Sequence, residues 1–362
     1  MAEWTFRSGE PTMILFLAVS SPLLHWSIAV VGLIFGLWLL TRGADWFVDG
    51  AAASARRFRM PPLLIGFLIV GFGTSVPEMI VSALASAQGA PLLALGNAYG
   101  SNIANILLIL GISALVAPIA IHRNVIKRDL PVLLGVTLLT LLLCANGQFS
   151  RMDGVLLLIV FSAFVAWQIF SSFRHPEPQT DEVPLSLKKS IVLTAGGLLA
   201  LLIASQILVR AARFIALRAA AVAGVDAASA DLIIGLTVVA IGTSLPELMS
   251  SVVAMRKGQD DIALGNIVGS NFFNTLAVVG IALVIKDVPT DEMPAALRFR
   301  DLGVMTGSTL LLWFFTILAW IRTRRNDAHW ITGRIELRRP VGILFLSLFV
   351  GYTVWVILGT HA

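Results

Sequence analysis

Charged residues, histidine and cysteine are all scarce in this sequence of 362 residues. Only 13% of the residues are charged, whereas a soluble domain has about 25%. The single cysteine, Cys144, excludes an intrachain disulfide. The five histidines show no metal-ligand spacing such as HExxH, and none lies near the repeated GTS segments. These shortages argue against a soluble enzyme, and we predict a protein without catalytic residues or a cofactor.

Apolar residues dominate instead. They make up 57% of the chain and form long runs from end to end, which predicts a polytopic α-helical membrane protein. A transmembrane β-barrel needs short alternating strands, and these runs are too long and continuous for that. We therefore expect an all-α membrane protein with ten transmembrane helices. Their expected ranges are 26–55, 61–87, 91–117, 130–146, 153–173, 188–222, 231–256, 261–286, 302–321 and 340–359.

The net charge of +5 comes from the connections between helices and not from a basic stripe that could bind nucleic acid. The five connections that follow odd-numbered helices hold 17 of the 26 Lys and Arg residues. By the positive-inside rule these connections are cytoplasmic, so both termini are expected to face outward. The compact chain, without a regulatory domain, fits the plasma membrane of a prokaryote.

A polar, proline-rich stretch (RHPEPQTDEVPLSL) divides the apolar runs into two halves. We expect an N-terminal segment, a first five-helix repeat, a cytoplasmic linker and a second five-helix repeat. Their boundaries are 1–25, 26–173, 174–187 and 188–362. Residues 12–25 are apolar but interrupted by serine and proline. An extra span there would upset the alternation of loop charge, so an interfacial helix is the favoured interpretation.

One segment of the chain occurs twice. Residues 71–111 and 240–280 align without a gap at a constant offset of 169, and both read GTS-x-PE followed by GN-x-x-GSN-x-x-N. Each half has five helices, and an odd number reverses the direction of the second copy. The sequence therefore predicts two inverted-topology repeats, the architecture of many secondary transporters.

Each copy carries one glutamate inside apolar sequence, Glu78 in the first and Glu247 in the second. A charge at the bilayer centre costs about 3 kcal/mol even on the lenient insertion scale, so such residues are normally paired or functional. One glutamate could snorkel or stay protonated and inert, but two at the same place in both repeats are hard to explain in that way. Because the repeats are inverted, we expect the two carboxylates to face each other at mid-membrane.

Hydroxyl and amide groups share helix faces with these glutamates. Thr74 precedes Glu78 by four residues, and Ser101 precedes Asn105 by four, so each pair lies on one face. The same stripes recur in the second copy, at Thr243 with Glu247 and at Ser270 with Asn274. For any single hydroxyl, packing between membrane helices is an equally good explanation.

Prolines and glycines beside the glutamates predict an interrupted helix in each copy. Pro77 and Pro246 lack a backbone N–H and clash with the preceding turn. With Gly73 and Gly242 nearby, they are expected to break or kink the helix and free carbonyl oxygens. Irregular backbone at membrane depth lines a cavity or is buried in protein. The following helix carries GxxxG pairs, expected to serve close packing, at Gly96 with Gly100 and at Gly265 with Gly269.

The candidate ligands are all oxygens, which disfavours zinc, copper and other softer metals. Calcium takes six to eight oxygen ligands, and the two glutamates with Asn105 and Asn274 would match its ligand preference and its charge. Sodium would use hydroxyls and freed carbonyls with less formal charge. The residues alone leave both cations open.

The paired motifs closely resemble the α-repeats of the calcium:cation antiporter superfamily, whose best-known members are the sodium/calcium exchangers. The flanking RGADWFVDGAAASA extends the resemblance to most of the chain. It implies exchange of calcium for monovalent cations by alternating access, in which the first and sixth helices slide across the other eight. It implies a calcium site of Glu78, Asn105, Glu247 and Asn274. It implies sodium sites of Thr74, Ser75, Ser101, Thr243, Ser244 and Ser270, with main-chain oxygens near Gly71 and Ala240.

Departures from related patterns bear on the counter-ion. Asn274 stands where potassium-dependent exchangers carry Asp, which favours potassium independence, and GTS-x-PE differs from the GN-x-x-E of proton-driven calcium exchangers, which favours sodium. Coupling to protons or potassium stays an alternative. A passive cation channel is less favoured, because oxygen rings also line selectivity filters but inverted repeats are typical of carriers. The expected partners are inorganic cations and the lipid bilayer, and the sequence does not indicate an oligomeric state.

Overall fold

The computed structural model describes residues 22–58, 60–174, 185–222, 240–325 and 334–359. Within these ranges, nine helices are long and apolar enough to cross a membrane. The helix expected at 231–256 is described only from Ala240 onward. The predicted interfacial segment lies outside the described residues except for its last four, which already belong to the first helix, and most of the predicted linker also lies outside.

The first half contains five spans, three of which change their winding along their length. The bounds are α2 (Pro22–Phe58), α3 (Pro62–Ile65), π-helical η1 (Gly66–Gly71), α4 (Phe72–Ala87), α5 (Pro91–Ile103), π-helical η2 (Ala104–Ile109), α6 (Leu110–Val116), π-helical η3 (Val125–Asp129), α7 (Leu130–Leu143), the 3-10 turn η4 (Cys144–Asn146) and α8 (Arg151–Arg174).

The second half repeats this order. The bounds are α9 (Leu187–Val222), α11 (Ala240–Thr243), α12 (Leu245–Arg256), α13 (Asp260–Phe272), π-helical η6 (Phe273–Val278), α14 (Val279–Ile285), π-helical η7 (Ala296–Asp301), α15 (Leu302–Arg325) and α16 (Arg339–Gly359). Every boundary from α5 to α6 differs by 169 from the matching boundary between α13 and α14. The predicted repeat is therefore present in the fold, including the π-helical turns η2 and η6 at equivalent positions.

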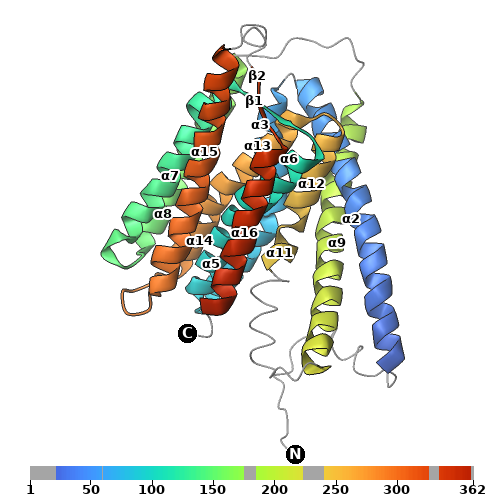
Figure 1. The fold of residues 1–362 in the computed structure, drawn as a ribbon, viewed down its shortest axis with the longest axis vertical. Helices are drawn as coiled ribbons and strands as arrows, with labels where there is room; N and C mark the ends of the chain where they lie inside the picture. Colours follow the sequence, from blue (N-terminus) through green and yellow to red (C-terminus); the bar gives the residue numbers. More distant parts are fainter. Residues whose placement is uncertain (1–21, 59, 175–184, 223–239, 326–333, 360–362) are drawn as a thin grey trace, which may run out of the picture.

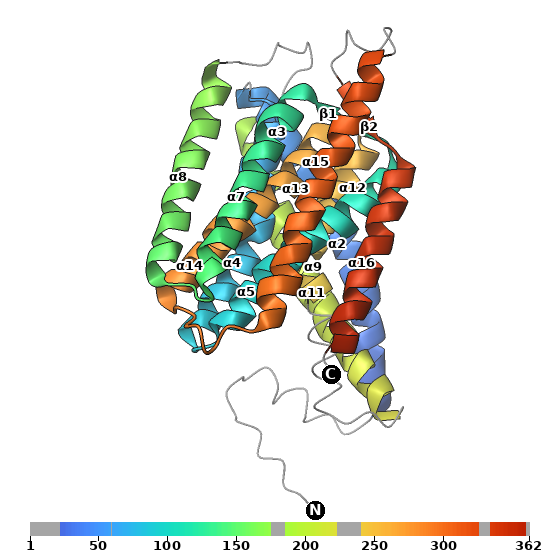
Figure 2. The same ribbon diagram turned by 60° about the vertical axis from the view of Figure 1, so that its left-hand side comes forward.

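The helices α2 and α9 form an antiparallel pair at one flank of the molecule. Figures 1 and 2 show them side by side, with one end extending beyond the other helices. Small residues bring the two backbones together, since a Cβ added at Gly43 would lie 2.9 Å from the backbone nitrogen of Leu201. A Cβ at Gly36 would lie 2.8 Å from Cγ of Leu208. Such contacts are typical of closely packed membrane helices.

The core of the molecule is built around α13 and its continuation into η6 and α14. Every residue from 262 to 280 is buried. Phe272 stacks on Phe164 of α8, with ring centroids 4.1 Å apart, and Phe67 of η1 packs against the same ring at 5.6 Å. The second copy of the repeat motif therefore runs through the most enclosed part of the protein.

Two short strands form a ribbon that the sequence did not predict. β1 (Ile119–His122) pairs antiparallel with β2 (Arg334–Leu337), with Ile119 opposite Leu337. A single bridge between Phe149 and Val288 joins two other loops, and Val288 lies 169 residues after Ile119. The inverted repeats are thus tied together through equivalent loops. Four-residue strands are too short to show a clear alternating pattern in sequence.

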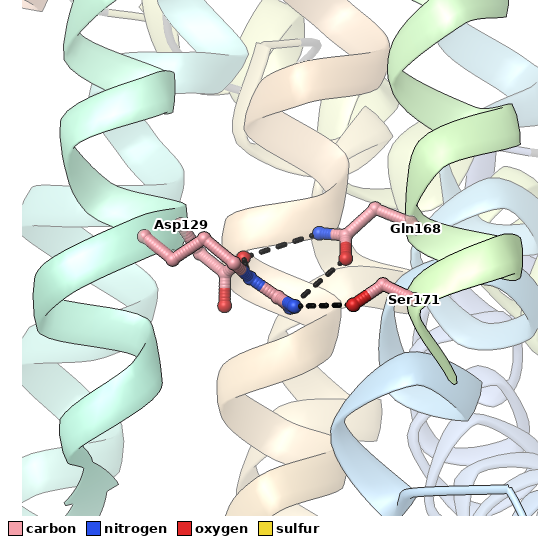
Figure 3. Close-up of polar contacts among 4 residues, drawn as sticks. Asp129, Gln168 and Ser171 are labelled. Carbon is pink, nitrogen blue, oxygen red and sulfur yellow. Dashed lines mark hydrogen bonds and ion pairs between the residues drawn. The ribbon is translucent and has the colours of Figure 1, made fainter. Parts of the chain in front are cut away.

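The fourth and ninth helices begin earlier than predicted, at Val125 and Ala296. The charged residues Arg128 and Asp129 suggested a loop before the fourth helix. They lie within η3 instead and form an ion pair, with Nε of Arg128 2.9 Å from Oδ1 of Asp129. Asp129 is 3% exposed and also accepts a hydrogen bond from Gln168 of α8 (3.2 Å), while Arg128 bonds Gln168 and Ser171 at 3.0 Å (Figure 3). The same elements line a cavity of about 270 Å³.

Arg300 and Asp301 form the equivalent pair in η7, at 2.7 Å. Asp301 accepts a hydrogen bond from the Tyr352 hydroxyl of α16 at 3.1 Å. In both halves, therefore, a helix can extend through two opposite charges because they pair with each other and with the fifth helix of their half.

Candidate functional site

The four residues expected to bind calcium are fully enclosed in the protein. Glu78, Asn105, Glu247 and Asn274 are each at most 2% exposed. All of their side-chain oxygen and nitrogen atoms lack a hydrogen-bond partner among the described residues, as does the hydroxyl of Ser75. Buried polar groups are almost always paired, and an unpaired buried carboxylate is especially costly. Such a concentration of unpaired groups is expected of a site that takes a polar or charged ligand.

Two π-helical segments carry the asparagines. Asn105 is the second residue of η2, and Asn274 is the second residue of η6. π-helical turns are rare and occur frequently at functional sites. The sequence predicted both amides but not the change of winding that presents them.

The two glutamates occupy different positions in their helices. Glu78 lies in the middle of α4, whereas Glu247 lies in the first turn of α12, where the partial positive charge of the helix terminus favours an anion. The two carboxylates are close enough for their charges to interact. Groups from both repeats therefore face one centre.

Hydroxyl groups bridge the two repeats around this centre. The Thr74 hydroxyl lies 3.2 Å from Oδ1 of Asn266, and Ser244 lies 3.5 Å from Ser101. The hydroxyl of Ser270 donates to the main-chain oxygen of Gly71 at 3.4 Å. All six predicted hydroxyl residues are buried. The structure thus brings most of the residues expected to bind sodium to the boundary between the repeats.

The break predicted at the prolines differs between the copies. In the second copy the chain leaves the helix at Ser244, between α11 and α12, and Pro246 lies in the first turn of α12. In the first copy α4 runs on through Pro77 without interruption, so the helix is not broken there. In the first copy the chain departs from α-helical winding earlier, in the π-helical segment η1.

Both predicted glycines, Gly73 and Gly242, lie within helices, in α4 and α11 respectively. Ala240 is the first described residue of α11. Gly73 belongs to the continuous α4, whereas Gly242 belongs to α11, which ends at Thr243. Thr243 is 9% exposed. Two of the sodium ligands expected from the second copy, Thr243 and the main-chain oxygen of Ala240, therefore lie on α11.

Asn266, the asparagine of the GN dipeptide in the second copy of the motif, is a further member of the site. Its Nδ2 lies 3.1 Å from the main-chain oxygen of Glu247, 3.0 Å from Ser250 and 2.8 Å from Ser251. Asn266 is fully buried, and its Oδ1 accepts the bond from Thr74. It fixes the start of α12 against α13 and connects it to the first repeat. The repeated GN dipeptide was the available sequence signal.

The GxxxG pairs also behave differently in the two copies. A Cβ added at Gly265 would lie 2.9 Å from the backbone nitrogen of Phe67, and one at Gly269 would lie 3.0 Å from the Phe67 Cα. Close packing is therefore confirmed for this pair. A Cβ at Gly96 or Gly100 would meet no atom of the described residues within 4 Å.

The chemistry of the site suits hard cations. Its donors are carboxylate, amide, hydroxyl and main-chain oxygens, and hard cations prefer these. No group of three or more His, Cys, Asp or Glu residues placed to hold a metal occurs in the described part of the chain. Two carboxylates supply the negative charge, and neutral oxygens supply the remaining ligands.

Comparison with known proteins agrees with this geometry. A family model described as sodium/calcium exchanger protein matches residues 28–170 and 189–358. The putative antiporter CaxA of Alkalimonas amylolytica is 40% identical over 90% of this chain and 97% of its own, and the inner membrane protein YrbG of Escherichia coli is 39% identical over 91% and 96%. The solved structure of the sodium/calcium exchanger from Methanococcus jannaschii superposes with a TM-score of 0.72 at 32% identity, covering 91% of this chain and 98% of that one.

Proposed function

The chain belongs to the sodium/calcium exchanger protein family, and on that premise we propose that it exchanges Ca²⁺ for Na⁺ by alternating access at a mid-membrane site. Membership makes it a multi-pass membrane antiporter of calcium and other cations, and not an enzyme. Its ten helices form two inverted five-helix repeats. The identity of the counter-ion, the ligands and the transport cycle belong to the proposal.

The observation that carries the proposal is the set of buried, unpaired groups shared between the repeats. The carboxylates of Glu78 and Glu247 and the amides of Asn105 and Asn274 are enclosed without partners among the described residues. These four would bind Ca²⁺, whose two positive charges match the two carboxylates. An ion supplies the ligand contacts that the protein itself leaves unmade.

Sodium would occupy sites formed by neighbouring oxygens. The proposed ligands are the hydroxyls of Thr74, Ser75, Ser101, Thr243, Ser244 and Ser270, with the main-chain oxygens near Gly71 and Ala240. The cross-repeat contact between Ser270 and the Gly71 oxygen supports this arrangement. Because the two negative charges of Glu78 and Glu247 would be balanced either by one Ca²⁺ or by sodium ions, binding of the two cations would be mutually exclusive, and this exclusion couples the two fluxes.

The antiparallel pair α2–α9 is the element that would move. Its helices pack on each other through glycines at close distance, and the pair lies at one flank of the remaining helices (Figure 1). A ligand shifts such an equilibrium only by its difference in affinity for the two states. We place both termini outside, and the plasma membrane is supported by the inner-membrane name of a relative.

The decisive experiment is calcium flux in proteoliposomes with sodium, potassium and proton gradients imposed one at a time. We expect an outward-directed sodium gradient alone to drive calcium uptake. Glu78→Gln and Glu247→Gln are each expected to abolish that uptake, because a neutral amide halves the negative charge of the site. Uptake driven only by protons or potassium would show that the counter-ion is that cation and not sodium. Uptake with no counter-ion gradient would indicate a channel. Unchanged uptake in both variants would refute the site.

A further inference from the structure

The main-chain oxygen of Gly242 is held by a residue outside the repeated motif. In an α-helix each carbonyl accepts a bond from the N–H four residues later. Four residues after Gly242 stands Pro246, which has no N–H. The hydroxyl of Ser205 on α9 donates to this oxygen at 2.7 Å. Ser205 is 4% exposed, so the contact is enclosed and little water competes for it.

This bond is unusual among the hydroxyls of α9. Ser190 donates to the oxygen of Ser186, and Thr194 donates to that of Ser190, so both stay within four residues of their own chain segment. Ser205 instead reaches a different helix. A serine that bonds its own turn contributes nothing between helices, whereas this one joins α9 to α11.

The position of the bond gives it a specific consequence. Gly242 lies in α11 between Ala240 and Thr243, both of which are proposed to bind sodium. Glu247 lies beyond the turn at Ser244, on α12, and is held separately through Asn266. Ser205 therefore fixes the sodium ligands on α11, Ala240 and Thr243, without contacting the glutamate that would bind calcium.

We propose that Ser205 is a positioning residue for counter-ion binding, which holds α11 through the oxygen that Pro246 leaves without a helix partner. This inference rests on the proposed function. Because α9 belongs to the pair that would slide, the bond also ties the position of that pair to the geometry of the counter-ion ligands. In the first copy Pro77 also stands four residues after Gly73, but α4 is continuous there, so no separate segment has to be held in place.

The test is the sodium dependence of calcium transport in Ser205→Ala. Losing the donor leaves the Gly242 oxygen unsatisfied and α11 loosely placed. We expect the sodium concentration for half-maximal transport to rise about fivefold to tenfold, the size expected for one buried hydrogen bond. The calcium concentration for half-maximal transport should change by less than about twofold, because the calcium ligands are held by other contacts.

Ser190→Ala is the matched control. It removes a buried hydroxyl from the same helix, but that hydroxyl bonds only the main-chain oxygen of Ser186, one turn before it, so both half-maximal concentrations should stay at the wild-type values. If Ser205→Ala does not give folded protein, Ser205→Cys, which keeps the volume but is a much weaker donor, should show the same selective rise.

Unchanged sodium dependence in the Ser205 variants would overturn the proposal. An equal rise for sodium and calcium would also overturn it, because that result indicates general loosening and not positioning of counter-ion ligands. Sodium-driven calcium transport by the wild-type protein distinguishes failure of the positioning role from failure of the proposed function. If sodium does not drive calcium transport in the wild type, the counter-ion assignment fails, whereas a sodium-driven wild type with an unaltered Ser205→Ala refutes only the positioning role.

Discussion

The two copies of the repeat share their local structure but differ in their surroundings. The helices from α5 to α6 and from α13 to α14 begin and end at equivalent residues. Yet Asn266 is fully buried with four polar neighbours, whereas its counterpart Asn97 is half-buried and its Nδ2 bonds only Ser82 among the described residues, at 3.2 Å. Identical motifs thus set the winding of a helix, while the neighbouring helices decide which side chains are held firmly.

The glutamate helices show the same contrast in reverse. The first copy is a continuous helix through Pro77, and the second is broken at Ser244. The copy whose amide is most firmly held therefore carries the less regular backbone. We infer a division of labour in which the second copy combines a rigid amide network with counter-ion ligands on α11, which ends at the break at Ser244.

The largest predicted difference between the copies concerns packing. Gly265→Ala should destabilise the protein by about 3 kcal/mol, the upper range for overpacking, because the added Cβ would meet backbone atoms of Phe67 and Gly66 at 2.9 and 3.0 Å. Gly96→Ala should change stability by less than about 0.5 kcal/mol, as an unobstructed helical substitution does. Thermal unfolding of each variant in detergent, monitored by size-exclusion chromatography, measures the two changes in stability. Equal losses would show that both glycines face a closely packed helix.

The second prediction concerns the amides. Asn266→Ala should lower the initial rate of calcium uptake by about 10-fold to 100-fold, because several buried partners lose a bond at once and buried networks are costly to leave half satisfied. Asn97→Ala should lower it by no more than about threefold, since one half-buried bond is lost. Uptake into proteoliposomes at equal protein content compares them. Similar losses for both would show that the two amides act symmetrically during the cycle, whatever their burial in this state.

These differences mark the limit of what the sequence can predict. The offset of 169 predicted the fold, the inversion and the pairing of Glu78 with Glu247 at one centre, because period and polarity are properties of the chain itself. The π-helical turns, the break at Ser244 and the bond from Ser205 could not be predicted from period and polarity. They depend on which helix lies opposite, and nothing in the ASQ sequence around Ser205 distinguishes it from any other helical serine.

A third prediction compares the anchors between the fourth and fifth helices of each half. Gln168→Ala removes bonds to both Asp129 and Arg128 and should destabilise the protein by about 2 kcal/mol. Tyr352→Phe removes one bond, to Asp301, and should cost about 1 kcal/mol. The thermal unfolding assay again applies. A larger loss for Tyr352→Phe would reverse the order and show that Arg300 depends on the hydroxyl to hold Asp301.

The smallest predicted effect concerns the two turns that follow the glutamate helices. Lys257, in the turn after α12, lies 3.1 Å from Asp45 and 2.8 Å from Asp49 of α2. The equivalent residue of the first copy, at offset 169, is Gln88, which carries no charge. The ion pairs therefore join the α2–α9 pair to the core in one copy only, on the side that we expect to be cytoplasmic. All three side chains are at least 29% exposed, so each pair contributes only about 0.2–1 kcal/mol.

Lys257→Gln should consequently shift the balance between the two open states by about twofold to fivefold, which corresponds to about 0.4–1 kcal/mol. The expected direction favours opening on the side of Lys257, because the ion pairs hold α2 against the core there. Calcium half-saturation measured from each side of oriented proteoliposomes detects the shift, and choline chloride should suppress the difference from wild type by screening the pairs. Gln88→Ala is the control and should leave both sides unchanged. A shift that persists at high ionic strength would mean that Lys257 acts through packing of its aliphatic chain and not through its charge.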